Sequence, residues 1–557
     1  MPKENTLLDL FYEKESNTPE KVFLRQPFGD KWKTYTWKEV GQISRKIATA
    51  IQSYNLPPKS NIGLVSKNCA EWIMTDLAIM MSGHVSVPLY ATLTGKQLNE
   101  VLTIGDVELV FIGKIDEWKD MSTGIPKDMP IIKFPQYSSG AIIDKGTAWE
   151  DLLEQHKPLE GYPVPNFEDT WTIVFTSGTT GTPKGVVLSY KKLKDLLDAS
   201  KESNNLKVSF DGDNKYFSFL PLNHIAERMI VENTAITYGG SISFAENLQT
   251  FTQNLVDTSP TVFFAVPRIW TKFQLGLLSK MPQKKLDRLL SIPIVSSMIK
   301  SKIKKGLGLN DARVNVSGAA PITEECKDWY KKLGINISEG YGMTENCAVC
   351  TWLPAEVSRP GSVGKANANA ELKIDEATGE VLMKASFIMN GYYKNPEQTA
   401  KTVKDGWLHT GDQGYIDDEG YLFLTGRIKD TFKTAKGQFI VPAPIEFKFQ
   451  GNDDIEQICL LGIGLPQPIA LVSLSDIGRN KSQEAIQESL NQTLATANEQ
   501  LDNYKKVSTL VLIKEPFSVE NGMLTPTLKT KRSVVNDRYK HLINAWHEDA
   551  NAVVVEA

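Results

Sequence analysis

The sequence predicts an α/β fold: a large N-terminal domain of layered parallel sheets with helical crossovers, followed by a small α+β domain. Two observations support this prediction. Apolar runs bounded by turn residues alternate with helical patterns through most of the 557 residues, and this length exceeds what a single hydrophobic core holds. Beyond Gly426 the chain becomes more charged, and its strand and helix patterns become shorter. We therefore expect two domains of unequal size.

A strand, a helix and a second strand are predicted between residues 61 and 89. Asn61–Ser66 has the pattern of a buried strand, Ala70–Ser82 has helical spacing, and His84–Leu89 is strand-like again. Strands that are joined at short intervals by a helix pair in parallel. Trp171–Phe175 and Thr261–Val266 repeat the strand pattern, and a polar or glycine-rich turn follows each of them.

The domain boundary is predicted at Gly426–Asp430, beside the charged segment Lys429–Lys436. After it, Ile458–Ile463 and Ile469–Ser473 have the pattern of paired strands, and Lys481–Leu501 has that of a polar amphipathic helix. The predicted domains are residues 1–428 and residues 429–557.

Composition and charge argue against several classes of protein. The 62 Lys and Arg residues nearly balance 66 Asp and Glu residues, for a net charge of −4, whereas a nucleic-acid-binding protein usually has a basic excess. No window reaches about 18 uninterrupted apolar residues, and the acidic N-terminal segment resembles neither a signal peptide nor a transit peptide. We expect a cytoplasmic protein.

The five scattered cysteines are too few for a disulfide framework in a chain of this length. Cys347 and Cys350 form a C-x-x-C pair, but no second pair or nearby histidine completes a zinc site. We expect two reduced thiols here rather than a redox or metal site.

A loop rich in glycine and hydroxyl residues directly follows the predicted strand Trp171–Phe175. Residues 176–185 read TSGTTGTPKG. Glycines let backbone N–H groups approach an anion, hydroxyls add donors, and Lys184 can bring a positive charge to the same phosphates. The spacing differs from the Walker pattern, because Gly178 and Gly181 lie too close together. The loop predicts a phosphate-binding site; the alternative is a flexible surface loop.

This loop resembles the signature loop of the adenylate-forming superfamily, which includes acyl-CoA synthetases, luciferases and peptide-synthetase adenylation domains. The resemblance extends from about Tyr35 to Arg532 and is closest to the long-chain fatty acyl-CoA synthetases. It implies that the chain binds ATP and Mg²⁺ and that the small domain is mobile. The implied phosphate-binding residues are Thr176, Ser177, Gly178, Thr179, Thr180, Gly181 and Lys184.

Two further motifs resemble the carboxylate and adenine sites of that superfamily. Residues 219–224, FLPLNH, match the segment that brings His224 to the reacting carboxylate, although a lone histidine is often structural. In residues 339–345, EGYGMTE, the resemblance implies that Tyr341 stacks on adenine, Thr344 contacts the α-phosphate and Glu345 binds Mg²⁺, with Thr176 as a second metal ligand. The other residues of the implied nucleotide site are Gly318, Ala319, Ala320, Glu339, Gly340 and Gly342.

Motifs near the C-terminal end match the ribose site and the catalytic lysine of the superfamily. Asp412, in residues 407–412 (WLHTGD), matches the carboxylate that binds the ribose. Arg427 is also expected near the ribose. Residues 524–532, LTPTLKTKR, contain Lys529, the implied catalytic lysine. A lysine there lowers the repulsion when a carboxylate attacks the anionic α-phosphate. Lys531 is the rival candidate, and a solvated basic surface is the alternative for both.

The resemblance also implies a second half-reaction, in which the acyl group passes to the thiol of CoA. Lys429 matches the hinge about which the small domain rotates in the superfamily. One face of the small domain would present Lys529 to the reacting groups, and the other face would present Lys436 and Gly437 to pantetheine. Long-chain synthetases often have Ser-Gly-Gly where this chain has Ala435-Lys436-Gly437. A carrier protein as acceptor and a luciferase-like oxidation therefore stay open as alternatives.

The acid is the least specified substrate. Residues 266–270 (VPRIW) and 389–394 (MNGYYK) resemble the long-chain fatty acyl branch, but no pattern gives the chain length. Lys284–Lys305 interleaves apolar and basic residues, which fits contact with a membrane surface or, more commonly, a helix packed on a domain. The expected partners are ATP, a fatty acid and CoA, without nucleic acid, and the oligomeric state is not indicated. A catalytically silent nucleotide- or lipid-binding protein is disfavoured, because the charged residues of the motifs are all present.

Overall fold

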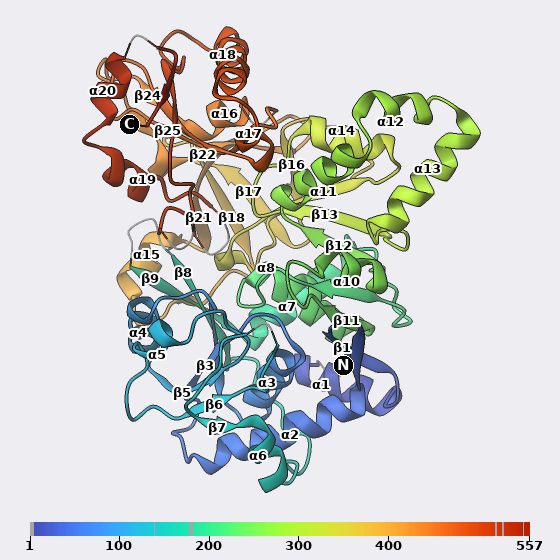
Figure 1. The fold of residues 1–557 in the computed structure, drawn as a ribbon. Helices are drawn as coiled ribbons and strands as arrows, with labels where there is room; N and C mark the ends of the chain where they lie inside the picture. Colours follow the sequence, from blue (N-terminus) through green and yellow to red (C-terminus); the bar gives the residue numbers. More distant parts are fainter. Residues whose placement is uncertain are drawn as a thin grey trace. The chain divides into compact units, whose positions relative to one another are not determined.

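Two compact units make up the chain (Figure 1). The computed structural model describes residues 5–138, 140–177, 182–449, 451–518, 521–525, 529–549 and 551–556. Unit 1 comprises Met1–Gly178, Pro183–Leu372 and Met383–Leu408, and unit 2 comprises Thr179–Thr182, Lys373–Leu382 and His409–Ala557. The predicted domain boundary at residues 428 and 429 remains a prediction beside this division.

The first sheet of unit 1 is built around strand β3 (Asn61–Val65), which runs parallel to β4 (Val85–Leu89) and to β5 (Val107–Ile112). Helix α3 (Ala70–Met81) connects β3 to β4, and α4 (Gly95–Ile104) connects β4 to β5. The strand, helix and strand predicted between residues 61 and 89 are therefore confirmed. The strand order is β19-β9-β8-β4-β3-β5-β6-β7. The other strands are β6 (Ile131–Lys133), β7 (Thr147–Ala148), β8 (Thr170–Ser177), β9 (Pro183–Ser189) and β19 (Gly391–Tyr392).

The second sheet has a parallel centre in which β10, β11, β12, β13 and β14 run in the same direction. Within unit 1 its strands follow the order β16-β15-β14-β13-β12-β10-β11-β1-β2. Antiparallel pairs flank the centre, so the sheet is mixed. The bounds are β1 (Val22–Phe28), β2 (Lys31–Thr36), β10 (Lys215–Ser218), β11 (Ser241–Phe244), β12 (Val262–Ala265), β13 (Val314–Gly318), β14 (Ile337–Tyr341), β15 (Thr351–Leu353) and β16 (Ser362–Ala366).

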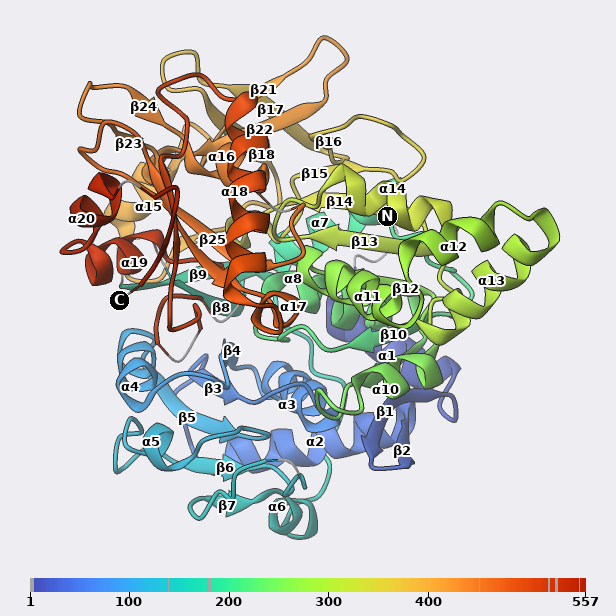
Figure 2. The ribbon, with the colours of Figure 1, turned by 45° about the horizontal axis from the view of Figure 1, so that its top comes forward.

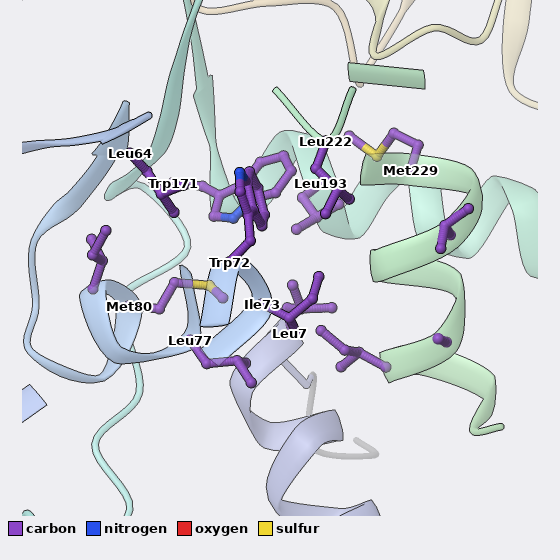
Figure 3. Packing of buried hydrophobic residues seen from close by; sticks show 14 of the residues in the cluster. Leu7, Leu64, Trp72, Ile73, Leu77, Met80, Trp171, Leu193, Leu222 and Met229 are labelled. Atoms are coloured by element: carbon purple, nitrogen blue, oxygen red, sulfur yellow. The ribbon is translucent and has the colours of Figure 1, made fainter. Parts of the chain in front are cut away.

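One large hydrophobic core joins the two sheets (Figure 3). Trp72 of α3, Trp171 of β8, Leu193 of α7 (Tyr190–Ser203) and Met229 of the π-helical turn η1 (Arg228–Asn233) meet in it. Because close-packed interiors deform little, this shared core fixes the edges of both sheets relative to each other. The neighbouring helices are α1 (Leu7–Asn17), α2 (Trp37–Ser53), α8 (Ile225–Glu227) and α9 (Thr234–Tyr238).

The remaining helices of unit 1 connect strands or cover the sheets (Figures 1 and 2). Helices α10, α11, α12, α13 and α14 accompany the second sheet around β12 and β13. Their bounds, with those of the others, are α5 (Lys119–Ser122), α6 (Trp149–Gln155), α10 (Phe251–Thr258), α11 (Pro267–Lys280), α12 (Gln283–Leu290), α13 (Pro293–Gly306), α14 (Glu324–Lys332), η2 (Thr344–Asn346) and α15 (Pro396–Thr402).

Unit 2 has its own α+β core. Its sheet has the order β25-β26-β27-β28, and β25 (Ile455–Leu461) pairs antiparallel with β26 (Ile469–Leu474), as predicted. Helix α18 (Gln483–Glu499) confirms the predicted amphipathic helix and packs Ile486 and Leu490 against this sheet. The other strands are β21 (Trp407–Ile416), β22 (Leu422–Arg427), β23 (Phe432–Lys433), β24 (Phe439–Ile440), β27 (Thr509–Leu512) and β28 (Val553–Val555). The short helices are η3 (Ile428–Asp430), α16 (Pro442–Phe447), α17 (Asp476–Arg479), α19 (Arg532–Tyr539) and α20 (Ile543–Glu548).

Three strands carry the chain across the division between the units: β17 (Ala370–Ile374), β18 (Glu380–Ala385) and β21. The short β20 (Val403–Lys404) pairs antiparallel with the start of β21.

The cysteines of the chain lie in its interior. All five cysteines are buried, and burial raises the pKa of the Cys347 thiol to about 12, so this thiol stays protonated. Among the helices in the described part of the chain, none combines the length and apolar character needed to span a membrane.

Candidate active site

Three of the predicted ligand-binding segments lie at one edge of the second sheet. In the parallel strands β13 and β14, Gly318 pairs with Gly340. The segment that ends at His224 follows β10, Ala319 follows β13, and the residues after Tyr341 follow β14. Carboxyl ends of parallel strands meet at the same sheet edge, which is where open α/β sheets bind ligands. The fold therefore brings together motifs that are far apart in the sequence.

The segment before His224 is braced by Asn68. The Asn68 amide donates to the Leu220 carbonyl at 2.6 Å, and the Leu222 N–H donates to Asn68 Oδ1 at 3.0 Å. His224 Nδ1 accepts the backbone N–H of Ala226 at 3.3 Å. Because Nδ1 accepts a hydrogen bond, the neutral imidazole carries its proton on Nε2. The half-buried ring can therefore offer an N–H donor to an anionic oxygen.

Two glycines of the predicted adenine site are required by the main chain itself. A Cβ on Gly318 would lie 2.9 Å from the Gly340 carbonyl oxygen, and one on Gly342 would lie 2.2 Å from the carbonyl carbon of Ala348. Ala319 has a φ of +66°, a left-handed conformation that side chains rarely adopt. A flat base could approach this turn closely, because small residues keep side chains out of its path.

Glu345 is the centre of a buried polar contact in unit 1. The hydroxyl of Tyr392 donates to Glu345 Oε1 at 2.7 Å, and both side chains are mostly buried. Lys184 Nζ lies 5.5 Å from the centre of the Tyr392 ring. Strand β9 explains this proximity, because it pairs Lys184 with Thr176 of β8 on one side and Val186 with Tyr392 of β19 on the other. The flanks of the predicted phosphate loop thus lie near the predicted metal-binding carboxylate.

The loop's central residues, Gly178, Thr179, Thr180 and Gly181, lie outside the described residues, as does the side chain of Ser177. Thr176 is described: its hydroxyl donates to the Lys184 carbonyl at 3.4 Å, within the β8–β9 pair.

The donors near Glu345 fit a magnesium ion that arrives with a nucleotide. Mg²⁺ prefers one or two carboxylates plus phosphate oxygens and water. Glu345 supplies one carboxylate, and its neighbour Thr344 is buried beside it. Within the described ranges, no group of three or more His, Cys, Asp or Glu side chains forms a ready-made metal site. The remaining ligands would therefore be those of the nucleotide.

Glu339 begins the predicted adenine motif as a buried carboxyl. Burial raises its pKa to about 7, and the ammonium of Lys327, 3.2 Å from Oε2, counteracts part of that rise. Near neutral pH the carboxyl is therefore partly protonated and can donate or accept a hydrogen bond.

In unit 2, Asp412 and Arg427 lie opposite each other in the β21–β22 pair. Arg427 Nε donates to Asp412 Oδ1 at 2.9 Å. The Asp412 side chain is buried, whereas Arg427 is about half exposed. A guanidinium that holds one carboxylate oxygen orients the other, which suits a carboxylate that accepts hydrogen bonds from a ribose. The structure thus brings together the two residues that are predicted to lie near the ribose, and their role in binding it stays a prediction.

Two further predicted sites of unit 2 lie on its surface. Lys436 and Gly437 form the turn between β23 and β24, where Gly437 has a φ of +77° and an added Cβ would meet nothing within 4 Å. Lys529 is exposed just before α19, and its backbone N–H donates to Thr525 Oγ1 at 3.0 Å. The isolated bridge between Leu524 and Thr530 holds this segment.

Sequence reasoning missed several polar residues that support the site. Tyr392 belongs to residues 389–394, which resemble the long-chain branch, but nothing in the sequence connects it to Glu345. Asn68 gives no signal, since its partners lie far along the chain. Glu227 is fully buried and accepts hydrogen bonds from the Ser218 hydroxyl at 3.0 Å and the Phe219 N–H at 3.1 Å. Burial raises its pKa to about 8.

Comparisons with known proteins agree with this geometry. Residues 11–393 match the AMP-binding enzyme family, and residues 429–551 match the AMP-binding enzyme C-terminal domain. Long chain acyl-CoA synthetase 6, peroxisomal, of Arabidopsis thaliana is 28% identical over 94% of this chain and 82% of its own length. Long-chain-fatty-acid–CoA ligase 1 of Homo sapiens is 29% identical over 93% and 82%.

Solved structures share the fold at lower identity. The A domain of carboxylic acid reductase from Segniliparus rugosus, in complex with AMP and a co-purified carboxylic acid, matches with a TM-score of 0.77, 20% identity, and coverage of 97% of this chain and 94% of that one. The o-succinylbenzoate CoA synthetase from Bacillus subtilis, in complex with its acyl-adenylate, matches with a TM-score of 0.74, 20% identity, and coverage of 96% and 99%.

The family match spans well over half of the sequence, and the fold presents three of the predicted motifs at one sheet edge. This chain therefore belongs to the AMP-binding enzyme family.

Proposed function

We propose that this protein is an AMP-forming long-chain fatty acid–CoA ligase, which converts ATP, a fatty acid and CoA into acyl-CoA, AMP and diphosphate. The observation that carries the proposal is the contact between Tyr392 and Glu345, with Lys184 beside it. It brings the lysine that we propose binds phosphate close to the carboxylate that we propose binds the metal. Membership of the AMP-binding family and relatives named long-chain synthetases support the same reading.

In the first half-reaction, a carboxylate oxygen of the acid attacks the α-phosphorus of ATP, and the bond to diphosphate breaks. Both reactants are anions, so the barrier falls when cations and N–H donors hold them. Lys184 would hold the β- and γ-phosphates, Thr344 the α-phosphate, and His224 Nε2–H the carboxylate. Lys529 would bridge the carboxylate and the α-phosphate. Mg²⁺, when bound with ATP at Glu345 and Thr176, would neutralise phosphate charge.

In the second half-reaction, the thiol sulfur of CoA attacks the acyl carbon, the bond to AMP breaks, and the thiol proton passes to solvent. We propose that Lys436 and Gly437 receive the pantetheine chain, because they form an exposed turn with open space around the glycine. A carrier protein presents the same pantetheine thiol, so it is the second candidate acceptor.

The adenine and ribose are assigned to residues with matching surroundings. Tyr341 is half-exposed beside the small turn at Gly318 and Ala319, which suits stacking on a flat base. The Asp412 carboxylate, oriented by Arg427, suits the two ribose hydroxyls. We also propose a cytoplasmic enzyme, in keeping with five buried cysteines that are too few for a disulfide framework in a chain of this length.

A substrate panel tests the proposal. The full-length protein is supplied with ATP, Mg²⁺ and acids from acetate to oleate, with CoA or a holo-carrier protein as acceptor, and AMP and thioester are measured. We expect the highest kcat/KM for long-chain acids and AMP release that depends on CoA. Glu345→Gln serves as the inactive control. Release of AMP without any need for CoA would contradict the ligase, and a preference for short or aromatic acids would contradict the long-chain assignment.

A further inference from the structure

Helices α12 and α13 form a hairpin that ends in exposed apolar side chains. Ile292 is 47% exposed, Ile294 79% and Met298 68%. Other large apolar side chains on the surface, such as Leu248 or Ile142, stand far from one another in the sequence. Figures 1 and 2 both draw the hairpin at the far end of unit 1, beyond α11 and β13. Single exposed apolar residues are ordinary, but a cluster at the tip of a hairpin is not.

The inner side of the hairpin is anchored, so the exposed residues are not explained by loose packing. Leu286 of α12 and Ile303 of α13 are buried in the same core as Trp270. Trp329 Nε1 donates to Gln283 Oε1 at 2.9 Å, which fixes the start of α12. The hairpin therefore has one side buried against the rest of unit 1 and a second side that faces outward.

The outward side of α13 is apolar near the tip of the hairpin and basic further along the helix. Ile294, Met298, Lys302 and Lys305 recur at intervals of four, four and three residues, so they lie along one stripe of the helix. All four are exposed. Their order puts the apolar residues at the tip and the lysines one to two turns behind it. A lysine at that distance can keep its ammonium in water while its stem covers apolar surface.

The charge of the hairpin is opposite to that of the chain. Residues 281–309 contain six Lys and one Arg against one Asp, a net charge of +6, whereas the whole chain carries −4. The basic side chains are Lys284, Lys285, Arg288, Lys300, Lys302, Lys304 and Lys305. An apolar tip with a basic surround matches an anionic lipid surface, where acyl chains receive the apolar residues and headgroups the cations.

We propose that the α12–α13 hairpin docks on an anionic lipid bilayer, with Ile292, Ile294 and Met298 inserted beneath the headgroups. Lys302 and Lys305 then lie at headgroup level. This inference does not depend on the identity of the acid. If the proposed function also holds, the dock brings the enzyme to the surface in which long-chain fatty acids partition.

The experiment is vesicle co-sedimentation of the full-length protein without any substrate. Vesicles of phosphatidylcholine with phosphatidylserine are compared with vesicles of phosphatidylcholine alone, at low and high salt. We expect binding to the anionic vesicles that weakens with salt. Each basic residue near such a surface strengthens binding about fivefold, so Lys302→Glu with Lys305→Glu should weaken binding more than about 25-fold.

A second variant, Ile294→Ser with Met298→Ser, tests the insertion and should also weaken binding to anionic vesicles. All four side chains are exposed, so both double variants should fold, which their unfolding temperatures check. The matched controls are Leu248→Ser and the pair Lys127→Glu with Lys201→Glu, exposed residues away from the hairpin that should bind like the parent. Absence of vesicle binding at low salt, or equal losses in the controls, would overturn the proposal. Because no turnover is measured, a failure of the proposed function would leave this result unchanged.

Discussion

At the residue scale, we propose that Lys529 is the group on which the adenylation step depends most. It is exposed just before α19, and its backbone N–H is tied to the Thr525 hydroxyl. We expect Lys529→Ala to lower adenylate formation by about 100- to 1,000-fold, because the carboxylate and the α-phosphate then lose their bridging cation. Thioester formation from preformed acyl-adenylate should largely persist. Diphosphate exchange measures the first step, and thioester formation from synthetic acyl-adenylate measures the second.

The matched control for that substitution is Lys531→Ala, two residues further along the same segment. Its effect on adenylation should be small if Lys529 is the bridging residue. Equal losses in both half-reactions for Lys529→Ala, or a larger loss for Lys531→Ala, would contradict the assignment.

Glu227 predicts a specific dependence of stability on pH. Its pKa is about 8 in the folded protein because of burial, against an ordinary value of 4.5. The folded state therefore holds this proton more tightly than the unfolded state, and the stabilisation is complete below pH 4.5. It is lost as the pH rises toward 8, at about 1.4 kcal/mol per pH unit. Glu227→Gln keeps an acceptor for Ser218 and Phe219 but cannot ionise.

We accordingly expect Glu227→Gln to gain stability relative to the parent protein as the pH rises from about 5 to 8. Urea unfolding of both proteins across this range measures the difference in unfolding free energy. A difference that stays constant with pH would show that Glu227 ionises at its ordinary pKa in the folded protein.

At the scale of elements, the apolar periodicity predicted those strands and helices whose formation depends on local burial. The segment from β3 to β4, the strand β8 and the pair β25–β26 follow directly from their apolar patterns. The antiparallel pairing of β9 with β19 could not be predicted, because it joins Val186 to Tyr392, which lie far apart in the sequence. The same is true of the contact between Tyr392 and Glu345 that this pairing produces. Motifs thus identified the candidate ligand-binding residues but not the residues that orient them.

In the hairpin α12–α13, the sequence pattern did not show where one helix ends and the next begins. A single amphipathic segment, Lys284–Lys305, is two helices broken at Ser291–Pro293. The proline begins α13, in keeping with its fixed φ and missing N–H. The break makes the two helices a hairpin, and Ile294 and Met298 are exposed because they lie at the tip of this hairpin.

One ion pair links the start of α19 to the core of unit 2. Arg532 donates to both oxygens of Glu446, at 2.7 and 2.9 Å, and its guanidinium is mostly buried. We expect Arg532→Met to destabilise unit 2 by about 2 kcal/mol or more, because the Glu446 carboxylate loses a charged donor pair. Adenylation should also slow, since Lys529 lies three residues before this anchor.

Arg479→Met is the control, because Arg479 pairs with Glu456 at 3.2 Å on the exposed surface. Its cost should stay below about 1 kcal/mol. Urea unfolding compares the two variants, and equal costs would contradict the anchoring role of Arg532.

At the scale of the whole molecule, the proposed reaction needs two faces of unit 2 in turn. We propose that Lys529 serves the first half-reaction and that the turn at Lys436 and Gly437 serves the second. These residues lie in different segments of one compact unit, and we propose that they reach the acyl group in two different arrangements of the chain. A rotation of the part of unit 2 that follows Lys429 meets this requirement, and Lys429 in the turn η3 is the expected pivot.

Lys429→Pro tests that pivot. Residues in a 3₁₀ turn such as Ile428–Asp430 typically have a φ of about −50 to −70°, which the proline ring also imposes. We therefore expect the substitution to keep this φ at residue 429 and to disfavour a different one. We expect one half-reaction to persist while the other, and with it overall acyl-CoA formation, falls roughly 100-fold. Lys429→Ala, which leaves φ free, should retain both. Because the side chain is removed in both variants, a loss confined to the proline variant identifies backbone rotation as the step that joins adenylation to thioester formation, and full activity in the proline variant would contradict it.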